Sequence, residues 1–131
     1  MQINIGVIGT GYWGSKHIEE YNNIKISDAN IKIVTCDNNP NLNTVNYNNY
    51  NKMIENEDLN AVSICAPNEF HYQITRDCLN AGISVLVEKP LAMTIEQGIE
   101  LIDIAKDNGL ILSVGHIFRF NNAINKIRFC V

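Results

Sequence analysis

The chain has 131 residues, of which 46% are hydrophobic and 18% charged, so its length and composition predict one globular domain with a sizeable core. The formal net charge is −4 and Lys and Arg form no basic stripe, which argues against a nucleic-acid partner because phosphate binding requires clustered cations. No apolar run approaches the roughly 20 residues of a membrane span, and the N-terminus does not resemble a signal peptide, so we expect a cytoplasmic protein without membrane contact.

Strand-like and helix-like segments alternate along the chain with short connections. The predicted strands are 2–9, 31–37, 59–67, 83–90 and 110–115, and the predicted helices are 12–23, 48–56, 69–81 and 94–108. Thr94 and Gln97 have the spacing of a capping box, and Gly82 and Gly109 follow helices in the usual C-terminal position. This alternation predicts an α/β fold, a Rossmann-like doubly wound parallel sheet in a single domain with helices on both faces.

The segment 37–51 is unusually rich in asparagine. It could be a low-complexity disordered insert. We favour a surface loop, because Tyr47 and Tyr50 offer it apolar anchors.

The four cysteines are Cys36, Cys65, Cys78 and Cys130, and none has the C-x-x-C spacing. Cys36 and Cys65 lie in apolar runs, where a thiol usually behaves as a small buried hydrophobic group. We therefore predict four unpaired thiols and no metal site.

The turn after the first strand contains Gly9, Gly11 and Gly14 in the spacing G-x-G-x-x-G, at the start of a predicted helix. There Gly9 permits a tight turn, Gly11 lets the backbone approach a pyrophosphate, and Gly14 allows close packing of helix on strand. Asp37 ends the second strand, 23 residues after Gly14, where an acid binds the ribose hydroxyls of a dinucleotide. This combination favours a dinucleotide site over a purely structural turn. Asp37 favours NAD over NADP, because a carboxylate repels a 2′-phosphate.

Glu88, Lys89 and Pro90 follow the fourth strand. A lysine there could hydrogen-bond a substrate hydroxyl and assist its deprotonation. It could equally be a surface lysine paired with Glu88. The local sequence leaves both interpretations open.

The segments GVIGTGYWG, SICAPNEFHYQIT, SVLVEKP and GHIFRFNNA together resemble the N-terminal half of the Gfo/Idh/MocA oxidoreductases, over about residues 3–127. The resemblance implies oxidation or reduction, with a nicotinamide cofactor, of a ring hydroxyl in a sugar, nucleotide sugar or cyclitol. The sequences of SICAPNEFHYQIT and GHIFRFN most resemble those of members that act on the 3-hydroxyl of UDP-N-acetylhexosamines. Phe118 and Asn122 depart from that subgroup, in which Glu and Pro are usual.

The resemblance also implies roles for individual residues. Thr10, Tyr12 and Trp13 would join the three glycines around the pyrophosphate, and Asp37 would hold the adenosine ribose. Lys89 would be the catalytic lysine and Glu88 would contact the nicotinamide ribose. The residues implied on the nicotinamide side of the cofactor are Pro67, Asn68, His71, Glu88, Lys89 and Pro90. Arg119 would lie close to the cofactor or the substrate. Pro90 is expected to follow a cis peptide bond.

Four aromatic side chains have non-functional interpretations as well. We expect His17 at the surface of the first helix, and Trp13 could simply pack beneath the glycine turn. His71, near a helix start, could be a local cap apart from the role that the resemblance implies. His116 follows a strand, which leaves both a pocket-lining and a core position open.

Members of this family carry a second α/β domain with most of the substrate site. We therefore expect residues 1–116 to form the dinucleotide-binding domain and 117–131 to be a shortened crossing segment toward a domain that this chain lacks. The crossing segment would present one apolar face if helical, which predicts self-association or a separate chain that supplies the second domain. The function expected is the NAD-binding part of an oxidoreductase with a sugar substrate, and the alternative is a catalytically idle or regulatory NAD-binding module.

Overall fold

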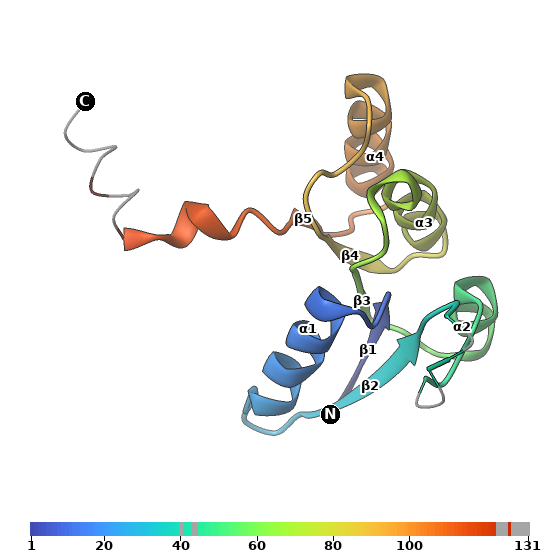
Figure 1. Cartoon of the computed structure of the whole chain (residues 1–131), viewed down its shortest axis with the longest axis vertical. Helices are drawn as coiled ribbons and strands as arrows, with labels where there is room; N and C mark the ends of the chain where they lie inside the picture. The colour runs from blue at the N-terminus through green and yellow to red at the C-terminus, as the bar shows by residue number, and fades with distance from the viewer. Residues whose placement is uncertain (40, 43–44, 123–125, 127–131) are drawn as a thin grey trace.

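The computed structural model describes residues 1–39, 41–42, 45–122 and 126, and it contains one five-stranded parallel sheet (Figure 1). The elements in chain order are β1 (Gln2–Ile8), α1 (Tyr12–Asn23), β2 (Asn30–Cys36), α2 (Tyr50–Asn56), β3 (Ala61–Ile64), α3 (Asn68–Asn80), β4 (Ser84–Val87), α4 (Ile95–Asp107), β5 (Leu112–Val114) and the 3₁₀ helix η1 (Ile117–Phe120). The order of strands across the sheet is β2-β1-β3-β4-β5. The predicted α/β class and the alternation of strands and helices are confirmed.

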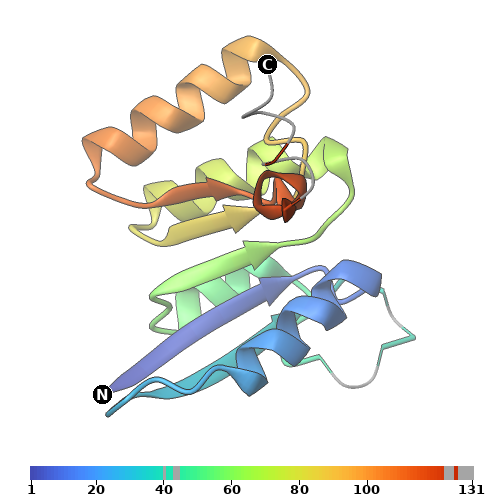
Figure 2. The ribbon, with the colours of Figure 1, turned by 90° about the vertical axis from the view of Figure 1, so that its left-hand side faces the viewer.

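The helices cover the sheet from both sides. Helix α1 lies on one face, and α2, α3 and α4 lie on the other (Figures 1 and 2). Parallel crossovers are right-handed, so the face that a helix covers depends on the direction in which the chain moves across the sheet. The chain moves one way from β1 to β2 and then returns past β1 to β3, which transfers the later helices to the opposite face. The neighbouring ends of β1 and β3 therefore form the switch point at which such sheets bind ligands.

The core lies between the sheet and the three helices of the second face. Val62, Ile64, Val85 and Val87 alternate along β3 and β4 and are at most 2% exposed. Helix α3 contributes the buried side chains His71, Ile74, Thr75, Cys78 and Leu79. Their spacing follows the helical period, so one stripe of α3 faces the strands.

Several predicted boundaries shift by a few residues for local reasons. Helix α2 begins at Tyr50 rather than at residue 48, because the side chain of Asn49 accepts hydrogen bonds from the N–H groups of Asn51 and Lys52 and so caps the helix. The capping-box prediction for α4 holds at Thr94, whose Oγ1 accepts from the N–H of Gln97 over 3.3 Å. The side chain of Gln97 accepts from the N–H of Met93.

The asparagine-rich segment is tied to the sheet at Tyr47, as the loop interpretation expects. The N–H of Asp37 donates to the carbonyl of Tyr47 over 3.1 Å, and the Tyr47 hydroxyl donates to Glu57 over 3.0 Å. Residues 40, 43 and 44 of this segment lie outside the described residues.

The segment after β5 begins with η1, whose Ile117, Phe118 and Phe120 are 56%, 67% and 81% exposed. The predicted apolar face combines Ile117 and Phe120 with three residues that lie outside the described residues: Ile124, Ile127 and Val131. That face therefore stays a prediction. Among the helices described, none is long and apolar enough to cross a membrane.

Candidate functional site

The residues predicted to form the site gather at one edge of the sheet, because the carboxyl ends of all its strands meet there. Gly9 follows β1 and Asp37 follows β2. Pro67 lies just after β3, and Glu88 and Lys89 follow β4. The strand order places Asp37 on one flank of the glycine turn and Glu88 and Lys89 on the other, with β3 between. An extended ligand across this edge would therefore pass all of them in turn.

The three glycines of the turn serve different steric needs. Gly9 has a φ of +86°, and a Cβ there would lie 2.7 Å from the backbone carbonyl of Cys65. A Cβ on Gly14 would lie 1.8 Å from the carbonyl oxygen of Gly9, so only glycine lets α1 approach the turn this closely. A Cβ on Gly11 would meet no atom within 4 Å. Gly11 is therefore not required by packing in the free chain, and the open space beside it suits a ligand that approaches the backbone.

Helix α1 begins at this open space. Gly11 is its N-cap residue and provides no side-chain cap. The N–H groups of the first turn of a helix have no partner within the helix, and together with the helix dipole they favour an anion. Tyr12 and Trp13 are 72% and 46% exposed and pack edge to face, with ring centroids 5.3 Å apart. The interpretation in which Trp13 packs beneath the turn is wrong, because its ring lies beside Tyr12 at the surface.

Asp37 is fixed to the glycine turn. Its Oδ2 accepts hydrogen bonds from the N–H of Thr10 over 2.7 Å and from the Thr10 hydroxyl over 3.2 Å. Its Oδ1 accepts from the N–H of Asn39 over 2.9 Å. A carboxylate has about four acceptor positions, so the anchored group can still accept hydrogen bonds from the hydroxyls of a ribose.

A pocket of about 640 Å³ lies against Asp37 and Gly11. Its walls include Tyr50, Pro67 and Phe70, which come from the starts of α2 and α3 and the loop after β3. The volume is within the range of about 300–1,000 Å³ that is usual for small-molecule and cofactor sites. The described residues that line it include no Lys or Arg, so nothing there would neutralise a 2′-phosphate.

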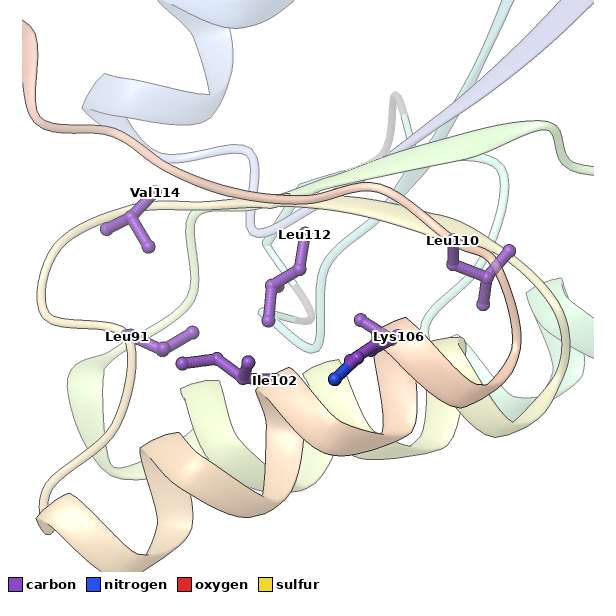
Figure 3. Close-up of a pocket in the computed structure, with 7 residues that line it drawn as sticks. Leu91, Ile102, Lys106, Leu110, Leu112 and Val114 are labelled. Carbon is purple, nitrogen blue, oxygen red and sulfur yellow. The ribbon is translucent and has the colours of Figure 1, made fainter.

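A second groove, of about 350 Å³, lies between α4 and the segment 110–114 (Figure 3). This segment includes β5, the outermost strand on the side of the sheet away from β2. Figure 3 shows Leu112 and Val114 above Ile102 and Lys106 of the helix, with Leu91 closing one end. None of the predicted site residues lines this groove, so we do not assign it to the cofactor.

At the end of β4, the carboxylate of Glu88 has a partner other than Lys89. Oε1 of Glu88 lies 3.0 Å from Nε2 of His17, and its carboxylate rests against Gly115, where a Cβ would be 3.1 Å from both oxygens. Glu88 is thus paired with His17 of α1, and Lys89 beside it is exposed. The lysine lies at the edge of the sheet rather than in an ordinary ion pair with its neighbour.

His17 is a residue that the sequence prediction missed. We expected it at the surface, but its side chain is 17% exposed and faces the sheet. Its Nδ1 lies 3.1 Å from Oγ of Ser63, which also contacts the hydroxyl of Tyr21 over 2.5 Å. Gly14, His17 and Tyr21 follow the spacing i, i+3, i+7 of one helix face, and the close approach predicted for Gly14 already indicated which face meets the strands.

His71 is buried rather than exposed to the pocket, at 1% exposure. Its Nδ1 lies 2.6 Å from the carbonyl oxygen of Pro90, and its Nε2 lies 2.8 Å from that of Ala66. Both partners are backbone carbonyl oxygens, one in the loop after β3 and one in the loop after β4. The side chain therefore links the loop after β3 to the loop after β4, which is more than the local cap considered from the sequence.

The remaining predicted residues lie in the segments that follow β3, β4 and β5. Pro67 and Asn68 begin α3 and are exposed, and the Lys89–Pro90 peptide bond is cis, as predicted. Arg119 lies on η1, beyond the end of β5, and is exposed. His116 is also exposed, which excludes the core position considered for it.

Three of the four thiols are described, and all three are free. Burial raises the pKa of Cys36 to about 11 and the pKa values of Cys65 and Cys78 to about 12. These groups are therefore protonated at neutral pH and do not provide a thiolate nucleophile or metal ligand. No cluster of three metal-ligating side chains occurs in the described part of the chain. Cys130 lies outside it.

Comparison with known proteins agrees with this geometry. The chain is 35% identical over 71 residues to the UDP-N-acetylglucosamine 3-dehydrogenase of Acidithiobacillus ferrooxidans, a match covering 54% of this chain and 23% of that protein. It is 48% identical over 59 residues to the D-glucoside 3-dehydrogenase of Escherichia coli, covering 45% of this chain and 17% of that protein. The crystal structure of myo-inositol 2-dehydrogenase from Lactobacillus plantarum matches 97% of this chain and 40% of that chain, with a TM-score of 0.80 and 28% identity.

The chain thus spans less than half the length of each of these proteins. Residues 3–116 match the family model described as an oxidoreductase family with an NAD-binding Rossmann fold. Because that match covers most of the chain and includes the glycine turn, Asp37 and the Glu88–Lys89 pair, the chain belongs to the Gfo/Idh/MocA oxidoreductase family and carries its NAD-binding domain.

Proposed function

We propose that this chain is the cofactor-binding part of an oxidoreductase that transfers a hydride between NAD and a ring hydroxyl of a sugar, nucleotide sugar or cyclitol. The observation that carries the proposal is the Asp37 carboxylate, fixed to the glycine turn beside a pocket of about 640 Å³. The similar proteins named as dehydrogenases of UDP-N-acetylglucosamine, D-glucosides and myo-inositol support the substrate class.

The cofactor would lie along the carboxyl edge of the sheet. Its adenosine would occupy the pocket, with the ribose hydroxyls donating to Asp37. Its pyrophosphate would accept hydrogen bonds from the first turn of α1, beside Gly11. The other nucleotide would then extend past β3 toward Glu88 and Lys89, because these follow next across the sheet. The carboxylate of Asp37 and the lack of a cation among the described lining residues favour NAD over NADP.

Lys89 is the proposed catalytic residue. Oxidation of a carbinol removes a hydride from carbon, which bound NAD⁺ accepts, and a proton from the hydroxyl, which requires a base. Lys89 is exposed at the end of β4, next to Glu88, and its ammonium or amine group can hydrogen-bond the substrate hydroxyl and take part in that proton transfer. The side chain of His71 supports this position, because it holds the carbonyl of Pro90 directly after the lysine.

The substrate itself would be held mainly by polypeptide other than residues 1–116. The similar proteins are more than twice as long as this chain. They therefore contain further polypeptide, outside the part that corresponds to this chain, in which sugar-binding residues can lie. Residues 117–131 would lead toward that part, in a longer form of the chain, in a separate chain or in a second copy. We place the protein in the cytoplasm, because protonated free thiols suit a reducing compartment.

The test combines cofactor binding with turnover. Calorimetry of the purified chain with NAD⁺ should show saturable binding, whereas incubation with NAD⁺ and UDP-N-acetylglucosamine, a methyl glucoside or myo-inositol should form little NADH by absorbance at 340 nm. No binding of NAD⁺ would contradict the proposed function. Rapid NADH formation, abolished by Lys89→Ala but not by the control Lys106→Ala, would support the role of the lysine and contradict the need for further polypeptide. Binding without turnover, even when a partner chain supplies a substrate domain, would favour the idle module.

A further inference from the structure

A chain of four polar side chains connects α1 through β3 to the end of β4. The hydroxyl of Tyr21 contacts Oγ of Ser63 over 2.5 Å, and the same Oγ lies 3.1 Å from Nδ1 of His17. On the other side of the ring, Nε2 of His17 lies 3.0 Å from Oε1 of Glu88. Ser63 is fully buried, and the side chains of His17 and Glu88 are 17% and 12% exposed. Of these four side chains, only Glu88 has a role in the cofactor site described above.

When Glu88 is ionised and the His17 ring is neutral, the hydrogen bonds along this chain can all be satisfied in only one direction. A carboxylate only accepts, so Nε2 of His17 carries the hydrogen and donates to Glu88. In a neutral ring Nδ1 then has a lone pair and accepts from the Ser63 hydroxyl, which in turn accepts from the Tyr21 hydroxyl. Tyr21, Ser63 and His17 each donate once, and the chain ends on the carboxylate of Glu88, which only accepts. The contacts of Tyr21 and Ser63 thereby determine which nitrogen of His17 faces Glu88.

The carboxylate of Glu88 is confined by this arrangement. One oxygen is held by His17, and both oxygens lie against the backbone at Gly115, where even a methyl group would be 3.1 Å away. Glu88 stands at the end of β4, on the opposite flank of the glycine turn from Asp37. A ligand group that extends past β3 would therefore meet a carboxylate whose position is already set before binding, which reduces the ordering cost of binding.

We propose that His17 is a positioning residue for the second nucleotide of the cofactor, acting through Glu88. This inference rests on the proposed function for the place of that nucleotide. His17 does not touch the cofactor in this proposal. It holds Glu88 in the orientation that accepts hydrogen bonds from the ribose next to the nicotinamide, and Ser63 and Tyr21 hold His17 in the tautomer that does so.

The decisive measurement compares two ligands, NAD⁺ and ADP, by calorimetry on the full 131-residue chain. ADP contains the adenosine and the diphosphate but lacks the second ribose and the nicotinamide. The His17→Ala variant should bind NAD⁺ about tenfold more weakly, as loss of one hydrogen bond to a charged group implies, and should bind ADP with unchanged affinity. The control Lys16→Ala, on the exposed side of the same helix, should change neither affinity.

Further variants separate positioning from general damage to the fold. His17→Gln can still donate to Glu88 and should recover part of the affinity for NAD⁺. Glu88→Gln should weaken NAD⁺ binding as His17→Ala does, and the double variant should be no weaker than the single ones, because both act through one contact. Equal loss of NAD⁺ and ADP binding in His17→Ala, or no loss of either, would overturn the inference.

A cofactor-free readout tests the hydrogen-bonded chain itself. Nitrogen-15 spectra of the free chain should show His17 with hydrogen on Nε2 and not on Nδ1, and Ser63→Ala should shift both signals. The opposite tautomer would overturn the proposed direction of the hydrogen bonds. If the unsubstituted chain binds neither NAD⁺ nor ADP, the proposed function is contradicted. If it binds both, and the ratio of the two affinities is the same in His17→Ala, this inference alone is contradicted.

Discussion

The backbone N–H of Thr10 donates to Oδ2 of Asp37 over 2.7 Å, so the acid at the end of β2 is joined directly to the turn at the end of β1. This contact couples two parts of the proposed cofactor site that lie 27 residues apart in the sequence. The carboxylate therefore has two functions that substitutions can separate. It orders the turn through Thr10, and it carries the negative charge that favours NAD over NADP.

Substitution of Asp37 should separate these two effects. Asp37→Asn keeps an oxygen that can accept from Thr10, so we expect the turn and the stability to be retained while the preference for NAD⁺ over NADP⁺ declines. Asp37→Ala removes the acceptor as well, and NAD⁺ affinity should fall about tenfold, as loss of charged hydrogen bonds implies. Calorimetry with both cofactors measures these changes. Tighter binding of NADP⁺ than of NAD⁺ by the unsubstituted chain would contradict the assignment of Asp37.

The glycines of the turn provide a matched pair of substitutions. In Gly14→Ala the new Cβ would meet the carbonyl oxygen of Gly9 at 1.8 Å, so the free energy of unfolding should fall by about 2 kcal/mol or more. In Gly11→Ala the Cβ meets no atom, so stability should change by less than about 0.5 kcal/mol, while NAD⁺ binding should weaken because the methyl group occupies the space of the pyrophosphate. Urea unfolding and calorimetry distinguish the two. Full NAD⁺ affinity in Gly11→Ala would mean that the pyrophosphate does not lie there.

Much of the fold could be predicted because its signals are local. The alternating apolar and amphipathic segments predicted the strands and helices, and the structure brings the glycine turn and Asp37 together at the ends of β1 and β2, as their positions in the sequence predicted. The roles of His17 and His71 were not predictable in the same way. Each depends on partners far away in the sequence: Ser63 and Glu88 for His17, and the Pro90 carbonyl for His71. A lone histidine on a helix carries no sequence signal for such partners.

Thr75 offers a test of the packing beneath the site. Its side chain is fully buried on α3, and its Oγ1 has no hydrogen-bond partner in the described structure. Thr75→Val replaces an unsatisfied hydroxyl by a methyl group of similar size, which should raise the free energy of unfolding by about 1 kcal/mol. Thr75→Ala, the control, leaves a cavity and should lower it. A clear loss of stability in Thr75→Val would show that the hydroxyl has a partner.

The thiols should be protected in the folded chain. Burial raises the pKa of Cys36 to about 11 and those of Cys65 and Cys78 to about 12, from a model-peptide value of 9.0. In a Cys130→Ser variant at pH 8, a disulfide reagent should therefore react roughly 100-fold more slowly with the folded than with the urea-unfolded chain. Rapid labelling of the folded chain would contradict this.

The same raised pKa values predict the direction of a pH effect on stability. Below pH 9 both states keep these protons. As the pH rises through 9 toward 11, the unfolded chain loses protons that the folded chain retains, so the free energy of unfolding should decrease. Urea unfolding at a series of pH values measures this slope.

The most direct test of the cofactor site follows the backbone amide signals of the chain by NMR during titration with NAD⁺. We predict saturable changes at Gly11, Trp13 and Asp37 and at Glu88, with Ile102 and Lys106 of α4, which line the other groove, serving as the internal control. The absence of saturable changes, or changes confined to the control residues Ile102 and Lys106, would contradict the assignment of the carboxyl edge of the sheet as the NAD site.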